Sequence, residues 1–290
     1  MIIDIHAHTT SRHLHGLHTT TADLDALRNY AKKFGIDKIY LMATYFPLKK
    51  SGVPNRKLLE KINGDPLFGC FGSLDMENNF SDGLSELTEL AQAELISGLK
   101  LYPGYQNIVL SDPKFAPFFQ LAEKHQLPVA CHSGELHHCC PKNQRDVLNY
   151  RCGQDCCLLD QRGELSQPRH LEKLALNFPK VNFIACHLAN PYFAGLRYAM
   201  EACPNIYTDI SGQFISGTAE DTPYYRKLIT EEIMEFLKLD NGPDRVLFGT
   251  DFPIQSYHDS LELVAALKLK PAMAKKLLYE NSQKLLNLKK

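Results

Sequence analysis

Short apolar segments alternate with amphipathic segments along the whole chain. The apolar segments are six to nine residues long and rich in Val, Ile, Phe or Tyr, and Gly, Pro, Asn or Asp commonly flanks them. This composition is typical of β-strands. We therefore expect eight strands, at residues 2–8, 38–43, 67–75, 96–103, 128–134, 181–187, 205–211 and 244–251.

The segments between these strands have the periodicity of amphipathic helices. Apolar residues recur at intervals of three and four from Leu24 to Phe34, and Gly35 follows where a helix would end. Four more segments show the same pattern, and we expect helices there as well, at residues 112–126, 167–179, 192–204 and 224–239.

Eight strands that alternate with helices predict an α/β fold, a single (β/α)8 TIM barrel. A doubly wound open sheet is the alternative, but no glycine-rich phosphate-binding loop follows the first strand, which favours the barrel. No linker rich in Gly, Ser or Pro divides the chain, so we expect one domain over residues 1–290. A helix at 258–268 and an extra C-terminal helix at 271–288 are expected to close the outer layer.

One connection, residues 133–166 after the fifth strand, is unusually long and has little periodicity. Loops of this length inside a compact domain are usually functional or mobile. In a barrel this loop would lie over the C-terminal face, where the loops that follow the strands build active sites.

Composition excludes several classes of protein. The apolar fraction of 44% and the charged fraction of 22% are ordinary for a globular domain, and a net charge of −1 gives no field that would attract nucleic acid. No run of eighteen apolar residues is present, so we expect no membrane span. Nine cysteines without a secretory signal indicate reduced thiols and a cytoplasmic location.

Histidines and a carboxylate occur where several of the predicted strands end. His6 and His8 end the first strand, and because alternate residues of a strand point to the same side, both imidazoles face the same way. Similar residues end three other strands, and a lysine lies near the end of the fourth: His132, His187, Asp251 and Lys100. These ends meet at one face of a barrel, and four histidines with a carboxylate suit a divalent metal such as Zn²⁺.

Each of these residues also has an ordinary structural interpretation. A single strand-end histidine such as His132 is commonly a capping or loop residue, and Asp251 before Phe-Pro is commonly a turn residue. The four histidines and Asp251 occupy corresponding positions in their β/α units, which favours one shared metal site over five unrelated roles.

The segments that carry these residues resemble the amidohydrolase superfamily. They are DIHAH (4–8), GLKLYP (98–103), VACHSG (129–134), FIACHLA (183–189) and FGTDFP (248–253). The set is most similar to the amidohydrolase-related group that includes aminocarboxymuconate-semialdehyde decarboxylase. The resemblance implies a distorted TIM barrel with one divalent ion, expected to be Zn²⁺, and a homodimer is common in this group.

The resemblance also implies roles for the five residues. It assigns His6, His8, His132 and Asp251 as metal ligands and His187 as a catalytic histidine. In this interpretation Asp251 accepts a proton from a metal-activated water, and His187 orients the water or polarises the substrate.

The expected reaction is hydrolysis of a C–N or C–O bond, in an amide, lactone or related ester, of a small anionic substrate. Non-oxidative decarboxylation is the alternative within the same group. A third alternative is a catalytically inactive metal-binding barrel, although every expected ligand position is filled.

Lys100 and Tyr102 share a strand face and are candidates to hold an anionic substrate or to pack beneath the site. In some branches of the superfamily a lysine at this place is carboxylated and bridges two metals. The more similar group carries the same GxKLxP segment with an unmodified lysine, so we expect one metal.

Cysteines and histidines are concentrated in residues 137–157 of the long loop. Cys152 and Cys156 have a spacing compatible with a second, structural zinc site, whereas free thiols are the ordinary interpretation. In the first loop His13, His15 and His18 are expected to be mostly solvated.

Overall fold

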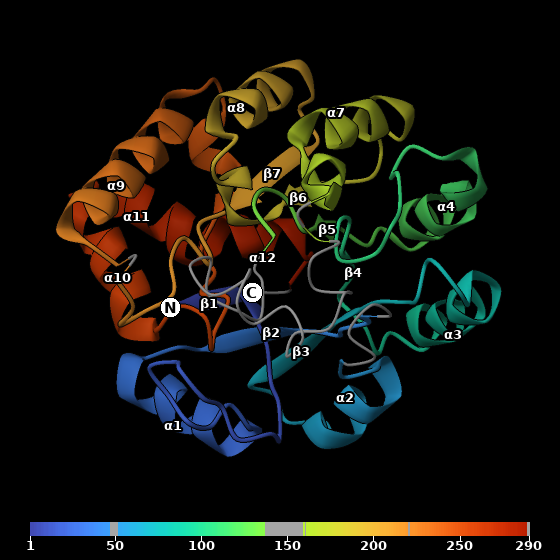
Figure 1. The fold of residues 1–290 in the computed structure, drawn as a ribbon, viewed down its shortest axis with the longest axis horizontal. Coiled ribbons are helices and arrows are strands. Elements are labelled where there is room, and N and C mark those ends of the chain that lie inside the picture. The colour runs from blue at the N-terminus through green and yellow to red at the C-terminus, as the bar shows by residue number, and fades with distance from the viewer. Residues whose placement is uncertain (47–51, 137–158, 160, 220, 289–290) are drawn as a thin grey trace.

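Eight parallel strands form the centre of the structure, and each pairs with the next in sequence order from the first to the eighth (Figure 1). The structure is a computed structural model that describes residues 1–46, 52–136, 159, 161–219 and 221–288. The strands are β1 (Ile3–Ala7), β2 (Lys38–Met42), β3 (Phe68–Gly72), β4 (Gly98–Leu101), β5 (Val129–Cys131), β6 (Phe183–Ala185), β7 (Ile206–Asp209) and β8 (Val246–Leu247).

Backbone hydrogen bonds bring the last strand back to the first. The Ile5 N–H donates to the Phe248 carbonyl at 3.0 Å, and the Asp251 N–H donates to the His6 carbonyl at 2.7 Å. The sheet is therefore a nearly closed TIM barrel, as predicted, and the doubly wound alternative is wrong.

Most of the helices surround the strands in a ring (Figure 1). The helices are α1 (Leu24–Phe34), α2 (Asn55–Ile62), α3 (Phe80–Gln92), α4 (Ala116–His125), α7 (Pro168–Asn177), α8 (Phe193–Ala202), α9 (Pro223–Lys238), α10 (Tyr257–Ala266), α11 (Pro271–Lys275) and α12 (Asn281–Leu285). Within the described residues, none of these helices is long and apolar enough to cross a membrane.

Local sequence sets the ends of α1 where the pattern predicted them. The Asp23 side chain accepts a hydrogen bond from the backbone N–H of Ala26 and so caps the first turn. Gly35 follows the last residue with a φ of 68°, the left-handed conformation that commonly ends a helix.

Two hydrophobic clusters hold the barrel together. The larger one lies between the strands and the surrounding helices, where Ile39 and Leu41 of β2 share a cluster with Leu27 and Leu58 from α1 and α2. The smaller one contains Ile3, Ile5, Tyr40, Met42, Phe71, Ala130, Ile184, Cys186, Leu247 and Leu285. Because its strand residues alternate with those of the larger cluster, they face the barrel interior.

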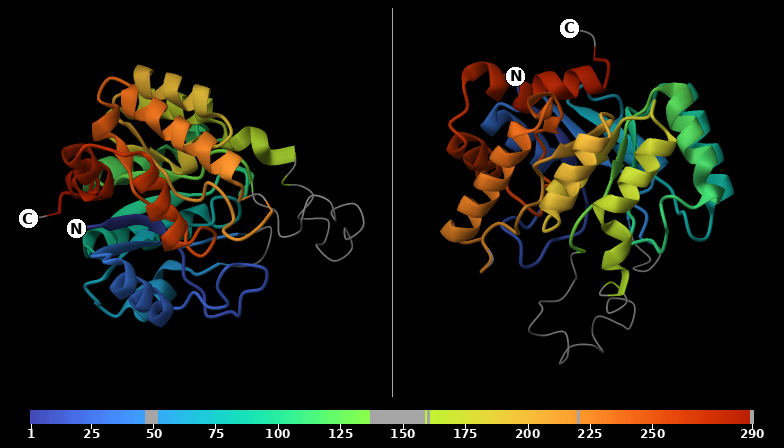
Figure 2. Two further views of the ribbon diagram at one scale, coloured as in Figure 1. Left: turned by 90° about the vertical axis from the view of Figure 1, so that its left-hand side faces the viewer. Right: turned by 90° about the horizontal axis from the view of Figure 1, so that it is seen from above.

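The sequence predicted that the C-terminal helix at 271–288 closes the outer layer, and only its first part does so, since Leu277 joins the larger cluster. It is divided into α11, a π-helical turn at Lys276–Glu280 and α12. Leu285 of α12 joins the interior cluster, and both chain termini lie at the same end of the barrel (Figure 2). This helix therefore covers the end where the strands begin, and its leucines shield the interior from water.

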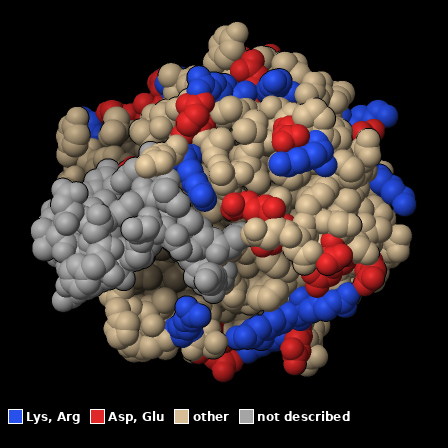
Figure 3. Space-filling view, turned by 45° about the vertical axis from the view of Figure 1, so that its right-hand side comes forward, with Lys and Arg blue, Asp and Glu red and all other residues tan. Residues whose placement is uncertain are grey.

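Charged side chains of both signs are intermixed on the face in Figure 3. Neighbouring elements pair several of them, as in the contact of Arg56 on α2 with Glu86 and Glu89 on α3. This distribution is consistent with the net charge of −1.

Candidate metal centre

Three of the predicted metal ligands converge where β1 and the segment after β8 meet. The Asp251 Oδ1 atom lies 3.1 Å from His8 Nε2 and 3.6 Å from His6 Nε2. One ligand atom from each residue lies within 4.8 Å of the others. The bond from the Asp251 N–H to the His6 carbonyl fixes this arrangement, so the closure of the barrel itself places the carboxylate beside the imidazoles.

His132 lies at the same face but is oriented differently. It directly follows β5, and its ring centroid is 5.0 Å from that of His187. Its Nε2 atom lies 3.1 Å from the Glu135 carbonyl oxygen, and His132 is not in the three-residue groups found among the described residues. The structure brings His132 to the cavity, and its role as a ligand stays a prediction.

His187 is presented by a strained turn rather than by β6 itself. The turn Cys186–Ala189 contains three successive residues with a left-handed backbone, with φ values of 63° at His187, 54° at Leu188 and 51° at Ala189. Residues with a Cβ atom rarely adopt this conformation, and it occurs preferentially at functional sites. The ring centroid of His187 is 4.9 Å from that of His6.

Gly212, after β7, leaves the space that these side chains need. A Cβ atom at this position would lie 2.7 Å from Asp251 Oδ2 and 2.9 Å from His187 Nδ1. Its φ of 57° also favours glycine. The absent side chain therefore allows the carboxylate and the imidazole to approach each other.

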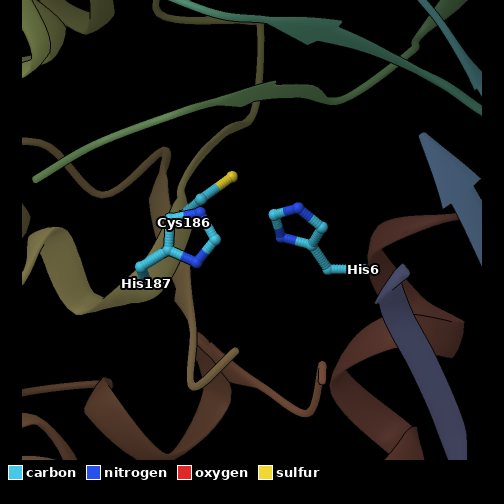
Figure 4. A group of neighbouring side chains, drawn as sticks. All are labelled: His6, Cys186 and His187. Carbon is cyan, nitrogen blue, oxygen red and sulfur yellow. The ribbon is translucent and has the colours of Figure 1, made fainter. Parts of the chain in front are cut away.

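Lys100 is fully buried beside the same imidazoles. Its Nζ atom lies 3.0 Å from Cys186 Sγ and 3.4 Å from His6 Nε2. His6, Cys186 and His187 form a second group whose potential ligand atoms lie within 4.8 Å of one another (Figure 4). Figure 4 shows these three side chains pointing toward one another from β1 and from the turn after β6.

Tyr102 follows β4 and is buried at the wall of the cavity. Its hydroxyl donates a hydrogen bond of 2.8 Å to the Ala43 carbonyl, and the Lys100 Nζ atom is 5.1 Å from its ring centroid. Its hydroxyl is therefore already used in a structural contact, although the ring still lines the cavity.

Two residues of the β7 segment, Asp209 and Ser211, contact both His6 and His187 and were not predicted. Asp209 Oδ2 lies 3.1 Å from His6 Nδ1, and Asp209 Oδ1 accepts a hydrogen bond of 2.9 Å from the His187 backbone N–H. Ser211 Oγ lies 3.1 Å from His6 Nδ1 and 3.0 Å from His187 Nδ1. Their only signal in the sequence is a pair of alternate polar residues at the end of NIYTDIS.

Burial and neighbouring charges favour neutral imidazoles and ionised carboxylates. Burial, with the nearby Lys100 ammonium, lowers the pKa of His6 to about 3, and burial also lowers the pKa of His187. Burial alone would raise the pKa of Asp251, but the hydrogen bond with His8 and the nearby imidazoles outweigh it and hold that pKa well below its usual range. These are the protonation states in which histidine and aspartate bind metal ions.

The candidate site opens into a cavity of about 400 Å³. Its walls include the predicted ligands, His187, Lys100 and Tyr102, together with Arg12 and Tyr105. A second cavity of about 340 Å³ also reaches His187, and its lining includes Asn190, Gln213 and Tyr225 together with the exposed Glu135. His187 therefore lines both the cavity that holds the predicted ligands and the second cavity beside it.

The donor set fits a divalent ion. Neutral imidazole nitrogens with a carboxylate oxygen are characteristic zinc ligands, and manganese accepts the same donors. Cys152 and Cys156, the predicted second zinc site, lie outside the described residues.

Several solved structures share the fold of the chain at low sequence identity. A 5-carboxyvanillate decarboxylase from Sphingomonas paucimobilis matches with a TM-score of 0.68 at 12% identity, covering 99% of both chains. A dihydroxybenzoic acid decarboxylase from a Polaromonas species, with bound manganese and the inhibitor 2-nitroresorcinol, matches with a TM-score of 0.68 at 15% identity, covering 99% of this chain and 97% of the other.

A third similar structure is described as a probable hydrolase. It is a probable 2-pyrone-4,6-dicarboxylic acid hydrolase from Acinetobacter baumannii with bound citric acid, with a TM-score of 0.66 at 15% identity over 99% of both chains. None of the functionally curated proteins matches the chain significantly. A sequence model described as amidohydrolase matches residues 3–288, nearly the whole length, and the chain therefore belongs to the amidohydrolase family.

Proposed function

We propose that the chain is a metal-dependent hydrolase that cleaves a C–N or C–O bond of a small anionic substrate. The observation that carries this proposal is the convergence of His6, His8 and Asp251 on one wall of a cavity that also contains His187. Membership of the amidohydrolase family supports it.

The proposed metal site uses His6, His8 and Asp251, with His132 as the expected fourth ligand. An ion held there would act as a Lewis acid and would lower the pKa of a bound water from 15.7 toward about 7. We propose Zn²⁺ as the native ion, and the manganese in the Polaromonas decarboxylase makes Mn²⁺ the first alternative to test.

In this proposal the Asp251 carboxylate is the proton acceptor. It is ionised, it touches His8, and it lies on the cavity wall, so it is placed to take a proton from the attacking water and deliver it to the leaving group. A proton acceptor must have an oxygen that water can reach. The Asp251 side chain is 9% exposed, so it meets this requirement.

His187 is placed to orient the attacking water. Its Nδ1 lies 3.1 Å from the Ser211 carbonyl oxygen, which only accepts hydrogen bonds, so Nδ1 carries the proton. Nε2 of the neutral ring is then an acceptor, which can hold a water by one of its hydrogens or take up a proton.

Two cationic groups in the cavity support an anionic substrate. Lys100 lies at the base of the cavity beside His6, and Arg12 is an exposed residue of its lining. A substrate carboxylate would pair with such groups through charge-assisted hydrogen bonds. The neighbouring chamber at Asn190 and Gln213 would hold an uncharged part of the substrate.

Decarboxylation is the second candidate function. It is supported by the fold shared with the Sphingomonas and Polaromonas decarboxylases. In that reaction His187 would assist protonation of the substrate carbon that loses CO₂.

Product analysis separates the two reactions. The protein, loaded with Zn²⁺ or Mn²⁺, is incubated with lactones, amides and carboxylated aromatic acids, and proton release and CO₂ release are measured in parallel. We expect release of a new acid or amine without CO₂, and no turnover by an Asp251→Asn variant. Release of CO₂ would establish the decarboxylase instead, and inactivity with every substrate class and both ions would contradict an enzymatic role.

A further inference from the structure

We infer that Asp209 is a positioning residue of the metal centre, because its carboxylate fixes the tautomer of His6 and the backbone of His187. The inference rests on the proposed metal site and concerns a residue that supplies no ligand itself. Asp209 ends β7 and is 1% exposed. It lies on the Nδ1 side of the His6 ring, whereas Asp251 and Lys100 lie on the Nε2 side.

Among the described residues, Ser211 and the His187 backbone donate hydrogen bonds to Asp209. Asp209 Oδ1 accepts from the Ser211 hydroxyl at 2.5 Å, from the Ser211 N–H at 3.2 Å and from the His187 N–H at 2.9 Å. Asp209 Oδ2 is left for His6 Nδ1 at 3.1 Å. A carboxylate has no proton to donate at neutral pH, so His6 must carry its proton on Nδ1.

This assignment determines which nitrogen of His6 is available to a metal. With the proton on Nδ1, the lone pair of the neutral ring is on Nε2, which faces Asp251 at 3.6 Å. A buried carboxylate that accepts the second N–H of a ligating histidine is a common arrangement in metal sites, where it orients the ring and raises its basicity.

The same carboxylate also supports the turn that presents His187. Its bond from the His187 N–H holds the first of three residues with left-handed backbone. The Ser211 hydroxyl donates to Asp209, so its oxygen is an acceptor for His187 Nδ1 at 3.0 Å as well as for His6 Nδ1. Asp209 therefore contacts both His6, the proposed ligand, and His187, the proposed catalytic histidine, and helps to hold the left-handed turn.

An asparagine at this position cannot reproduce the pattern. If its Nδ2 group replaces Oδ2, two donors face each other at His6 Nδ1 and the ring is driven to the other tautomer, with its proton on Nε2. If the amide is flipped, Nδ2 instead faces the backbone N–H groups of Ser211 and His187. The first orientation therefore takes the lone pair away from Nε2, and the second leaves buried donors without an acceptor, which is costly.

The matched control is Asp4→Asn, at a second fully buried carboxylate beside His6. Asp4 accepts bonds from the His6 backbone N–H and from Thr250, and in the described residues it bonds to no imidazole. Asp4 is as fully buried as Asp209, so the two substitutions replace carboxylates of equal burial. The Thr250 hydroxyl can accept from the new amide group.

Two measurements test the inference without turnover. The metal-free wild type is labelled with ¹⁵N-histidine, and long-range ¹H–¹⁵N correlations report the tautomer of His6. The His6 signal is assigned by its absence from the spectrum of a His6→Gln variant. We expect the Nδ1–H tautomer. Competition with a chelator then gives the Zn²⁺ dissociation constant, which we expect Asp209→Asn to raise by roughly 10- to 100-fold and Asp4→Asn to change by less than about threefold.

The outcomes separate this inference from the proposed function. An Nε2–H tautomer in the wild type overturns the inference, and this outcome does not depend on whether Asp209→Asn folds. An unchanged Zn²⁺ affinity in folded Asp209→Asn, or an equal loss in Asp4→Asn, also overturns it. Failure of the substrate screen would contradict the proposed function and leave these two measurements unaffected, whereas a wild type that binds no divalent ion would contradict both.

Discussion

The proposed chemistry of this chain depends on side chains that come just after the strands, some of them with unusual backbone conformations. Asp251 and His187 both have positive φ values, of 57° and 63°, and Gly212 lies against both side chains. Such conformations cost free energy and persist only where the surrounding contacts hold them. At the scale of single residues, the proposed function therefore has two requirements: a reactive side chain at His187 and the space that Gly212 leaves beside it.

Replacing His187 by alanine tests the chemical demand. If His187 orients water or transfers a proton, kcat should fall by roughly 10²- to 10⁴-fold, while the protein keeps its bound metal. Activity on the substrate found in the product screen and metal content by elemental analysis check this expectation. His8→Ala is the comparison that should lose the ion. If His187→Ala also loses the metal, His187 is a ligand. That outcome would agree with the closeness of its potential ligand atom to those of His6 and Cys186.

Replacing Gly212 by alanine tests the demand for space. The new Cβ atom would lie 2.7 Å from Asp251 Oδ2 and would have to displace a proposed ligand. We expect the Zn²⁺ dissociation constant to rise by roughly tenfold or more. Gly217→Ala is a matched control, because Gly217 has a φ of 75° but has nothing within 4 Å of an added Cβ atom. Equal effects of the two substitutions would attribute the loss to backbone strain and would contradict this steric explanation.

At the scale of elements, the hydrophobic pattern predicted all eight strands but extended most of them too far. The segment 244–251 contains a strand only at Val246–Leu247, and 181–187 contains one only at Phe183–Ala185. The pattern continues past these strands because the turns after them are also buried. Periodicity cannot reveal that His187 adopts a left-handed turn, since that turn depends on contacts with the neighbouring β7 segment.

The same limit explains why Asp209 was not predicted. Its role arises from His6, which is 203 residues away in the sequence, and nothing within NIYTDIS distinguishes a buried hydrogen-bond acceptor from an ordinary polar strand residue. His6, His8 and Asp251 were predicted to lie together because each ends a strand and a barrel brings strand ends to one face. Topology locates such residues, whereas the orientation of a ring such as that of His132 requires the structure.

The contact between α9 and α10 gives a prediction about acid stability. Asp259 of α10 accepts hydrogen bonds from Ser216 at 2.5 Å and Ser256 at 2.6 Å and pairs with Arg226 of α9 at 2.6 Å. Burial alone would raise the pKa of Asp259, but these partners lower it from 3.8 to about 2. A depressed pKa in the folded state stabilises the protein above pH 3.8, and this stabilisation is lost as the pH falls toward 2.

Asp259→Asn should therefore lower the melting temperature at pH 6 by about 2 °C, for a loss of about 1 kcal/mol at this partly solvated contact. The difference from the wild type should narrow as the pH is lowered from 4 toward 3, which thermal melts followed by circular dichroism can measure. Glu201→Gln, at an exposed residue of α8, serves as the control and should show no such narrowing. A difference that stays constant down to pH 3 would refute the role of the ionised carboxylate.

At the scale of the whole molecule, the two ends of the barrel have different properties. Leu285 of the C-terminal helix joins the apolar cluster at the end where the strands begin. The opposite end holds the histidines, Asp251 and a cavity of about 400 Å³. The strands thus connect an apolar end to the end that holds the candidate metal site, which is the usual division in TIM barrels.

Because the proposed ligands come from β1 and from the segment after β8, metal binding should stabilise the entire barrel by holding its first and last strands together. Only the folded chain assembles this site, so an ion at 100 times its dissociation constant should add about 2.7 kcal/mol, which is roughly 5 °C in melting temperature for a domain of this size. Calorimetry of chelator-treated protein with and without Zn²⁺ measures the shift. The double variant His6→Ala, His8→Ala should abolish it, whereas His13→Ala, His15→Ala, at an exposed histidine pair in the first loop, should preserve it. If the shift disappears only in the His13→Ala, His15→Ala variant, the stabilising ion binds in that loop. Metal binding would then not hold the first and last strands together.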